Sequence, residues 1–410
     1  MSEPRAPHPR RTYVFLVATG LIAVETMLFT MVVPALPVYA ERYGLSDPAA
    51  ALIFAAFPIA QLGGAIATAG LVERLGRRPA MTAGAILLLV ATLAFAVAGD
   101  PVSLALARAL QGLAAGMAWT AGLAAISDVY PGGQLGFRIG LAETAGGGFG
   151  LLGPVVGGFL IEAVGIERTF LLAAAAPAVL ALPAALAPET RRAARRAAPP
   201  ILGALRRVLA EPAARAGAAA LGAVAAVLAL LEPLLPLDLD ERLALTPSSI
   251  GLVFAAGLLA NFAFAPLAGR WSDRHGRREP ILVGGALMAG ALPLVAVGPA
   301  PLVAAAFAAV GAGFAIMAAS SGPLLTQAVD DAGMFGMYGL SAAMLTVIFS
   351  VGYAIGPLAG AAVRLVLPFW VAAAAAAAAV LITAIWAYRQ LGRPAGRPAE
   401  HPAIAARPEA

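Results

Sequence analysis

Twelve long apolar runs dominate this sequence of 410 residues, and each is long enough to cross a lipid bilayer as a helix. Crossing the hydrocarbon core takes about 20 residues, because the core is about 30 Å thick and a helix rises about 1.5 Å per residue. With 61% hydrophobic and 12% charged residues, the chain is too apolar for a soluble protein. We therefore predict an all-α, polytopic membrane protein. The expected spans are residues 13–39, 49–72, 80–98, 102–124, 139–161, 169–187, 216–237, 248–267, 280–297, 301–327, 337–363 and 367–388.

The placement of the basic residues predicts the topology. All 27 are arginines, and 22 of them lie in the terminal segments or in loops that follow even-numbered spans. Arg42, Arg168, Arg242 and Arg364 lie in the other loops, and Arg108 lies inside a span. Because arginine is enriched in cytoplasmic loops, we expect both termini in the cytoplasm and the chain in the cell (plasma or inner) membrane. This distribution also explains the net charge of +5 without a nucleic-acid partner.

A short charged turn occurs twice in the chain. Residues 69–78 read AGLVERLGRR, and residues 269–278, which begin 200 residues later, read GRWSDRHGRR. Two proline motifs repeat at nearly the same offset. Three motifs in register predict a duplicated membrane bundle. The repeated proline motifs are Pro34 and Pro37 with Pro233 and Pro236, and Gly153-Pro154 with Gly356-Pro357.

The duplication predicts two pseudo-symmetric bundles of six helices each, residues 1–187 and 216–388. Residues 188–215 form an arginine-rich cytoplasmic linker, in which 201–209 fits a basic amphipathic helix lying on anionic lipid. Residues 389–410 are rich in proline and arginine, so we expect a disordered cytoplasmic tail. The first run is longer than the apolar core of a signal peptide, and we expect it to be a span rather than a removed leader.

Charged residues inside the spans are the first functional candidates, because a charge in lipid is unfavourable unless a cavity or a partner offsets it. Glu25 lies about 20 Å into the first span. Arg108 lies in the fourth span and Glu232 in the seventh. We expect Glu25 to carry protons; the alternative is a structural acid bonded to a neighbouring helix. Arg108 is either a fixed positive charge that tunes a nearby acid such as Glu25 or an arginine that snorkels or binds backbone carbonyls.

Three further polar residues are open to two interpretations each. Glu143 opens the fifth span, either as a proton-coupling acid or as an interfacial one. Gln61 and Asn261 suit substrate contact as well as bonding between helices. The chain has no cysteine, and His8, His275 and His401 lie outside the spans, so we expect neither a metal site nor a cofactor.

The two charged turns resemble the loop signature of the major facilitator superfamily of secondary transporters. In that family this loop joins two helices of each half and holds the cytoplasmic gate shut. The resemblance implies that the acid of each turn faces a helix N-terminus or an arginine of the other half. The implied gating residues are Glu73, Arg74, Arg77, Asp273, Arg274 and Arg277.

Motifs inside the spans extend this resemblance. Arg108-x-x-Gln-Gly is similar to the superfamily motif of helix 4, and this resemblance favours a role for Arg108 in tuning Glu25. The stretch Gly-Pro-x-x-Gly in the fifth span resembles the helix 5 motif found mainly in proton-driven exporters, and it implies a helix bent at the proline. The implied bending residues in the two halves are Gly153, Pro154 and Gly157, and Gly356, Pro357 and Gly360.

Three stretches resemble the drug:proton antiporter branch that includes the vesicular amine transporters and multidrug efflux proteins. They are ETMLFTMVVP from Glu25, LEPLLP from Leu231 and GYAIGP from Gly352. The resemblance implies that Glu25, Glu232 and Tyr353 line a central cavity. Phe57 stands where the amine transporters carry a lysine, which favours looser handling of apolar or cationic compounds.

These features predict a monomeric proton-coupled antiporter that exports small amphipathic or cationic compounds by alternating access. Its partners are then the substrate, protons and the lipid bilayer. One alternative is a proton symporter that imports a sugar or an organic acid. Another is a membrane-embedded enzyme, although such an enzyme needs a cluster of His, Asp or Cys that the sequence lacks. A sensor that binds ligand without transporting it is the third.

Overall fold

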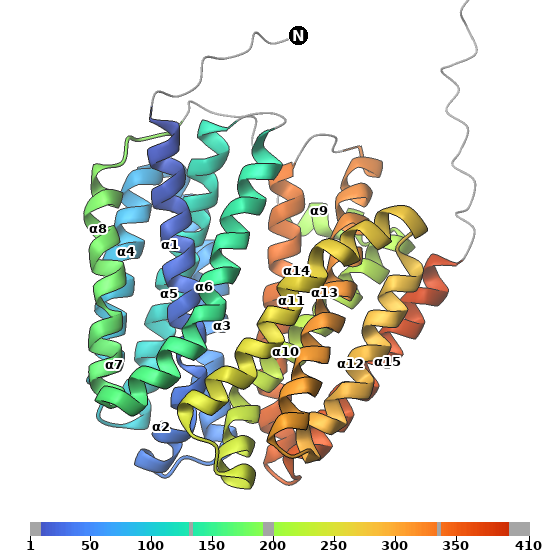
Figure 1. Ribbon diagram of the computed structural model, residues 1–410. Coiled ribbons are helices and arrows are strands. Elements are labelled where there is room, and N and C mark those ends of the chain that lie inside the picture. Colours follow the sequence, from blue (N-terminus) through green and yellow to red (C-terminus); the bar gives the residue numbers. More distant parts are fainter. Residues whose placement is uncertain (1–9, 131–133, 192–200, 334–337, 393–410) are drawn as a thin grey trace, which may run out of the picture.

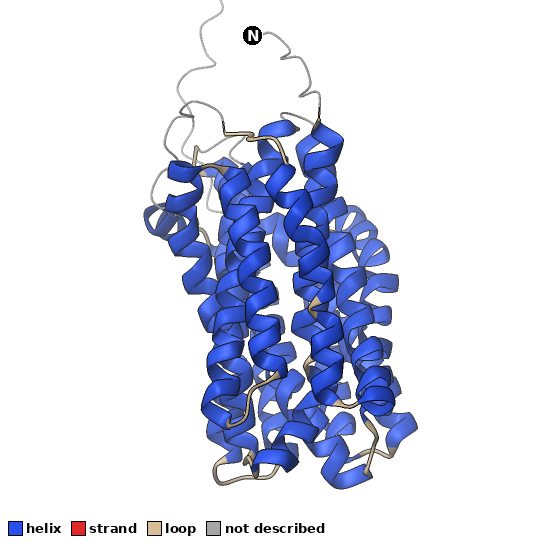
Figure 2. Cartoon of the chain, turned by 90° about the vertical axis from the view of Figure 1, so that its left-hand side faces the viewer, coloured by secondary structure: helices blue, strands red, loops and turns tan. Residues whose placement is uncertain are grey.

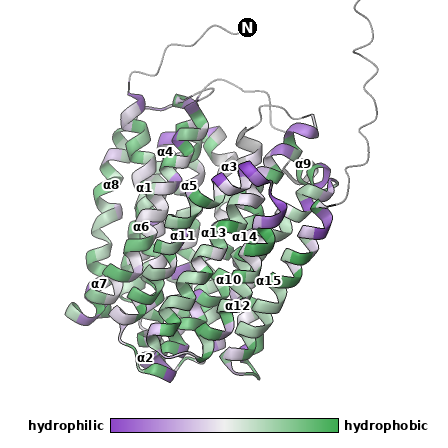
Figure 3. Cartoon of the chain, turned by 45° about the vertical axis from the view of Figure 1, so that its right-hand side comes forward, coloured by the Kyte–Doolittle hydropathy of each residue, from purple (hydrophilic) through white to green (hydrophobic). Residues whose placement is uncertain are grey.

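The computed structural model describes residues 10–130, 134–191, 201–333 and 338–392. Every regular element in these ranges is helical (Figure 2). Twelve of the helical segments in the described ranges are long and apolar enough to span a membrane, which confirms the predicted number there. Hydrophilic residues gather toward the ends of the bundle and apolar ones along its length (Figure 3).

The helices form two groups, which we call the first half (α1–α8) and the second half (α10–α15) (Figure 1). The first half comprises α1 Arg11–Met31, η1 Val33–Ala35, α2 Leu36–Tyr43, α3 Asp47–Leu75, α4 Arg77–Ala96, α5 Pro101–Val129, α6 Leu135–Val164, α7 Ile166–Ala173 and α8 Ala175–Leu186. After α9 Ile201–Val208, the second half comprises α10 Pro212–Leu243, α11 Pro247–His275, α12 Arg278–Val297, α13 Ala300–Asp331, α14 Tyr338–Arg364 and α15 Phe369–Leu391.

Two expected boundaries are corrected by these elements. α10 begins at Pro212, inside the expected linker 188–215, because proline is well accommodated in the first turn of a helix. α15 continues to Leu391, so the expected tail 389–410 begins with helical residues, and its remainder lies outside the described residues apart from Gly392. A helix is present where one was predicted at 201–209, as α9, while its position on anionic lipid stays a prediction. Its Ala204 and Val208 are buried, and α9 packs against α13 and α14.

The repeated proline motif in the first and seventh spans has different consequences in the two halves. At Pro34 the α-helix gives way to the 3₁₀ turn η1, as expected for a residue without a backbone N–H. Pro233 and Pro236 instead lie inside the continuous helix α10. The repeated proline motif therefore interrupts the α-helix only in the first half.

The glycines of the Gly-Pro motifs mark equivalent close helix contacts in the two halves. A Cβ atom at Gly153 of α6 would lie 2.5 Å from the carbonyl oxygen of Met27 on α1. A Cβ atom at Gly356 of α14 would likewise approach the carbonyl oxygen of Ala226 on α10. Small residues permit such close packing between membrane helices. Gly157 and Gly360 extend the same contacts by one turn, while Pro154 and Pro357 lie inside unbroken helices, and their bending role stays a prediction.

Several contacts between the two halves lie at one end of the bundle. α1 begins and α15 ends at the other end, which we call the terminal face (Figure 1). At the opposite face, α6 lies against the start of α11, where the Glu162 carboxylate accepts a hydrogen bond of 2.8 Å from the Ser248 backbone N–H. There too, Arg364 of α14 forms an ion pair with Asp47 of α3. These contacts join the halves and close the opposite face.

Candidate functional site

Glu25 is buried in the middle of the first half. Its side chain is 3% exposed, and its carboxylate accepts hydrogen bonds from Gln61 Nε2 at 3.2 Å and from Thr26 Oγ1 at 3.1 Å. Among the described residues it forms no ion pair. Gln61 lies on α3, so the structure brings together two residues, Glu25 and Gln61, that the sequence analysis named separately. A carboxyl in this setting is held by neutral donors, which are compatible with either protonation state.

Arg108 on α5 is completely buried, which excludes an arginine that snorkels to the membrane surface. Its Nη1 donates to Gln111 Oε1 at 3.0 Å, whereas Nε and Nη2 have no hydrogen-bond partner. Four aromatic rings surround the guanidinium, with centroids 4.6 to 6.0 Å from Cζ. Aromatic faces stabilise a desolvated cation, and both Glu25 and Glu232 attract it electrostatically. The rings belong to Phe29, Phe54, Phe57 and Phe95.

Glu232 on α10 is the buried acid of the second half and directly precedes Pro233. It is 6% exposed, and its Oε1 accepts a hydrogen bond of 2.7 Å from the Tyr353 hydroxyl. Its Oε2 has no hydrogen-bond partner. Glu232 also lines a small cavity of about 30 Å³, together with Asn261 of α11 and Thr30 of α1. This space admits a water molecule but not a drug-sized compound, so binding such a compound requires the halves to move.

An aromatic contact joins the two acids across the halves. The ring of Tyr353 lies 6.0 Å from that of Phe29, which in turn lies beneath the Arg108 guanidinium at 5.4 Å. We call these five residues, Glu25, Phe29, Arg108, Glu232 and Tyr353, the central cluster. The sequence patterns identified all of them except Phe29, whose contact with the arginine depends on how helices far apart in the chain pack.

Glu143 lies apart from the central cluster. Its side chain is exposed and forms no hydrogen bond or ion pair with any described residue. It precedes Gly146 by one turn of α6, and Gly146 packs against Ile22 and Thr26 on α1. Glu143 is therefore about 5 Å closer to the terminal face than the level of Glu25.

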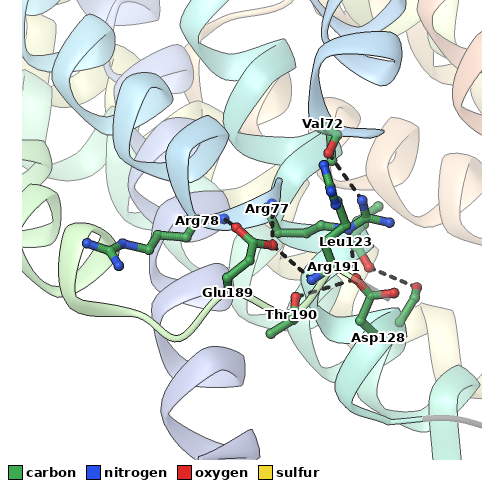
Figure 4. A network of polar contacts seen from close by, with 9 residues as sticks. Val72, Arg77, Arg78, Leu123, Asp128, Glu189, Thr190 and Arg191 are labelled. Carbon is green, nitrogen blue, oxygen red and sulfur yellow. Dashed lines mark hydrogen bonds and ion pairs between the residues drawn. The ribbon is translucent and has the colours of Figure 1, made fainter. Parts of the chain in front are cut away.

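Two acids from other parts of the first half bind the first charged turn (Figure 4). The buried Arg77 donates from Nε to Asp128 Oδ2 at 2.7 Å and from Nη1 to the carbonyl oxygen of Val72 at 3.1 Å. Glu189, which follows α8, accepts hydrogen bonds from the backbone N–H groups of Arg77 at 2.9 Å and Arg78 at 3.1 Å. It thus binds the N-terminus of α4, where the helix dipole favours negative charge.

Sequence reasoning missed both Asp128 and Glu189. Their signals were available: an acid near the end of the fourth span, and Pro-Glu-Thr immediately after the sixth. Burial alone would raise the pKa of the Glu189 carboxyl, but the hydrogen bonds from backbone N–H groups outweigh it and hold the pKa below its usual range. Glu189 is therefore a capping anion for α4.

We expect Glu189→Gln to lower stability by about 1 kcal/mol at pH 7, as the loss of a helix cap does. In detergent this corresponds to a thermal midpoint about 2 °C lower. Because the folded-state pKa lies below the unfolded value of about 4.3, the stabilisation is complete above that value and is lost as the pH falls through the folded-state pKa. The difference between the two proteins should therefore shrink as the pH is lowered through the folded-state pKa of Glu189. Glu279→Gln, an exposed acid in the first turn of α12, is the matched control; a shift equal to the control's would contradict the capping role.

The remaining gating candidates do not bridge the halves in this conformation. Arg277 donates to Gln327 Oε1 at 2.9 Å, while Asp273 and Arg274 are exposed without a hydrogen bond or ion pair to the described residues. The carbonyl oxygen of Arg74 accepts a hydrogen bond from Arg191. The side chain of Glu73 lies outside the described part of the structure. These residues lie at the terminal face, and those with described side chains form no hydrogen bond or ion pair with the other half in this conformation. Their role as a gate therefore stays a prediction.

The fold is shared with a transporter of known structure. A bacterial homolog of the human lysosomal transporter Spinster, solved in an inward-facing and unoccupied conformation, superposes with a TM-score of 0.77 over 94% of this chain and 98% of that one. Its sequence is 15% identical, so this likeness concerns the fold alone.

Two curated relatives share parts of the sequence. The quinolone resistance protein NorA of Staphylococcus aureus is 34% identical over 138 residues, which are 32% of this chain and 34% of NorA. The chromaffin granule amine transporter of Rattus norvegicus is 29% identical over 314 residues, 73% of this chain and 57% of that protein. The matched segments therefore span only a third to just over half of these relatives' own lengths.

The sequence profile of the Major Facilitator Superfamily matches residues 18–231 and 217–408, nearly the whole chain. This agrees with the helical architecture and with the motifs in both halves. It also sets aside the alternative of a membrane-embedded enzyme. The protein belongs to the major facilitator superfamily of membrane transporters.

Proposed function

We propose that the protein is a proton-coupled antiporter that exports small amphipathic or cationic compounds, with both termini in the cytoplasm. The observation that carries this proposal is the central cluster. It contains one buried carboxyl from each half, Glu25 and Glu232, and one buried arginine between aromatic rings. Ionisable groups inside membrane spans are costly and are found at ion and substrate pathways.

Glu25 is the proposed proton carrier. Without an ion-pair partner among the described residues, its buried carboxyl favours the neutral, protonated form. A proton arriving from the outside binds one carboxylate oxygen. When that proton leaves toward the cytoplasm, the carboxylate is stabilised by the positive charge of Arg108. Glu143, one turn closer to the terminal face, is the proposed acceptor of the departing proton.

Glu232 is the proposed contact for a cationic substrate. Its Oε2 is free, and the nearby rings of Tyr353 and Phe349, 5.0 Å apart, offer apolar and cation-binding faces. Asn261 and Gln61 add neutral hydrogen-bonding groups. A substrate cation that enters from the cytoplasm lowers the affinity of the cluster for a proton, because both positive charges compete for the same carboxylates. The printed names of the two curated relatives, a quinolone resistance protein and an amine transporter, are consistent with this substrate class.

Closure of the opposite face fits an inward-facing state of this cycle. The halves are joined there by Arg364 and Asp47 and by Glu162 and Ser248. In the outward-facing state these contacts must open, and the charged turns at the terminal face would come together as the gate.

Transport by antiport is tested in everted membrane vesicles whose interior has been acidified. Lipophilic cations of several sizes are added, and proton release is followed with a pH-sensitive dye. We expect cations to release protons and uncharged analogues of equal size to release none. Vesicles that respond to no cation, but show proton-driven uptake of a sugar or an organic acid, would instead establish a symporter.

We expect Glu232→Gln to weaken the apparent affinity for cationic substrates by about tenfold, because one charge-assisted contact in a desolvated site contributes about 1.4 kcal/mol or more. The maximal rate and the affinity for uncharged substrates should change little. A concentration series of cations in the dye assay measures the affinity for cations, and inhibition of that signal by increasing amounts of an uncharged compound measures the affinity for uncharged compounds. Asp240→Asn, on the same helix but exposed near the opposite face, serves as the control. Equal weakening for charged and uncharged substrates would show that Glu232 is not the cation contact.

A further inference from the structure

A second cavity, of about 500 Å³, opens at the N-terminus of α12, on the terminal face of the second half. Its volume falls within the range of about 300 to 1,000 Å³ that is usual for small-molecule sites. Leu324 and Leu391 form its apolar wall, and its polar residues include Ser272, Arg277 and Arg278. No residue of the central cluster is among the described residues that line it. We call this cavity the α12 pocket.

The α12 pocket carries an excess of positive charge. Arg277 and Arg278 line it, against a single carboxylate, that of Asp273. Glu279, the acid in the first turn of α12, is exposed and does not line it. The Arg278 guanidinium is held in place by the ring of Tyr388, whose centroid lies 3.7 Å from Cζ, and by a hydrogen bond of 3.0 Å from Nε to the Tyr388 carbonyl oxygen. The charges around this pocket therefore favour an anion.

The N-terminus of α12 adds hydrogen-bond donors. The first backbone N–H groups of a helix have no partner within the helix and carry partial positive charge. Within the described ranges, no side chain caps this end of α12. The donors that a helix N-terminus offers to an anion are thus still available here.

The first half shows which chemistry fills the equivalent place. There the Glu189 carboxylate accepts hydrogen bonds from the backbone N–H groups of Arg77 and Arg78, and a Cβ atom at Gly76 would collide with it. At Gly276, the repeat of Gly76, an added Cβ would meet no atom within 4 Å. The space that an oxyanion occupies in the first half is therefore open among the described residues of the second.

A buried hydroxyl provides a second, independent sign of a ligand. Ser272 of α11 is 4% exposed and lines the pocket, yet its Oγ has no hydrogen-bond partner among the described residues. Most buried side-chain hydroxyls are hydrogen-bonded, so an exception needs an explanation. A serine hydroxyl donates readily to an oxyanion, which would supply the missing partner.

We propose that the α12 pocket binds a phosphate group. Its donors are the backbone N–H groups of α12, the arginine guanidinium groups and the Ser272 hydroxyl, which come from two helices and the turn between them. A phosphate group presents up to three strong acceptor oxygens to such a set, whereas a carboxylate presents two. A bound phosphate caps α12 as Glu189 caps α4, and it stabilises one position of the second charged turn. This inference does not depend on the proposed substrate or on proton coupling.

Both a lipid headgroup and free phosphate carry this group, and the test separates them. Binding is measured as a rise in the thermal midpoint of the full-length protein, delipidated in a neutral detergent at pH 7. The probes are inorganic phosphate, with sodium chloride of equal ionic strength as its reference, and phosphatidylglycerol, with phosphatidylcholine as its reference. We expect at least one probe to raise the midpoint saturably while its reference does not. A response to phosphatidylglycerol alone identifies a lipid headgroup, a response to inorganic phosphate alone identifies free phosphate, and a response to both means that the phosphate group itself is sufficient.

Three variants assign the response to the pocket. Arg278→Gln should weaken the apparent affinity for the responding probe at least tenfold, because a hydrogen bond to a charged group changes an equilibrium constant by about that factor or more. Ser272→Ala should weaken it at least threefold. Without a probe, the Ser272→Ala protein should unfold at the wild-type temperature or above, since it loses only a buried hydroxyl that lacks a partner in the described structure. Arg270→Gln, which changes an exposed arginine of the same turn outside the pocket, should alter the affinity less than twofold.

Three results would overturn the proposal. The first is that neither probe raises the midpoint above its reference. The second is a response that Arg278→Gln and Arg270→Gln weaken equally, which would place the anion elsewhere on the basic terminal face. The third is a lower midpoint of the Ser272→Ala protein without a probe, which would show that this hydroxyl already has a partner within the protein.

Discussion

Glu25→Gln is expected to abolish substrate-driven proton release while leaving the protein folded. Glutamine has nearly the same shape as a protonated glutamate, and it can keep hydrogen bonds to the neighbouring Gln61 and Thr26 side chains. It has no exchangeable charge, however. A central cluster without a titratable group in the first half can bind substrate but cannot couple it to a proton, so the dye signal in acidified vesicles should fall to background.

A matched control keeps this result specific. Glu41→Gln removes an exposed acid of α2, in the same half but near the opposite face, and it should retain proton release. Direct binding of a fluorescent lipophilic cation in detergent should persist in the Glu25 variant, which separates lost coupling from lost folding. Proton release at the wild-type rate in Glu25→Gln would show that Glu25 is not the proton carrier. Glu232, the other buried carboxyl of the cluster, would then be the candidate.

Hydropathy and repetition were enough to predict the fold, because the backbone N–H and C=O groups of each span must form their hydrogen bonds within the span when lipid surrounds it. Length and apolar content identify such spans one at a time, but they do not indicate which helices pack closely. In the structure Gly153 contacts α1 and Gly356 contacts α10 in the same manner. The ends of elements were less predictable: Pro212 starts a helix inside the expected linker, where its arginine-rich surroundings suggested a loop.

The candidate site was only partly predictable, for a related reason. Glu25, Arg108 and Glu232 stood out because a charge within an apolar run is conspicuous. The aromatic surroundings of Arg108 come from α1, α3 and α4, and a phenylalanine in such a sequence carries no distinguishing mark. Asp128 and Glu189 fall at span ends, where an acid is usually solvated. Their pairing with the first charged turn follows only from the way in which α5 and the segment after α8 reach it.

The closure of the opposite face depends on glycine at position 158, and Gly158→Leu is expected to weaken it strongly. An added Cβ there would lie 2.4 Å from the carbonyl oxygen of Pro247 and 2.8 Å from the Ser248 Cα. Both neighbours are backbone atoms of α11 in the other half, so no side-chain rotation can make room. Overpacking of this kind is unfavourable by about 1 to 3 kcal/mol. Because the strain exists only while the halves touch, the conformation with this face open becomes about 5 to 150 times more populated.

The shift is measured with a single cysteine at Val33, a buried residue of η1 that lines the cavity between the halves. In the proposed topology both termini are cytoplasmic, so the opposite face is turned to the outside of the cell. A membrane-impermeant maleimide added to cells then reaches Val33→Cys only when this face opens. We expect its labelling rate to rise at least fivefold in the Gly158→Leu background. Gly148→Leu is the control on the same helix, since a Cβ atom there would meet no atom within 4 Å. Equal labelling in the two backgrounds would mean that the contact between α6 and α11 does not limit opening, and that Arg364 and Asp47 hold this face closed instead.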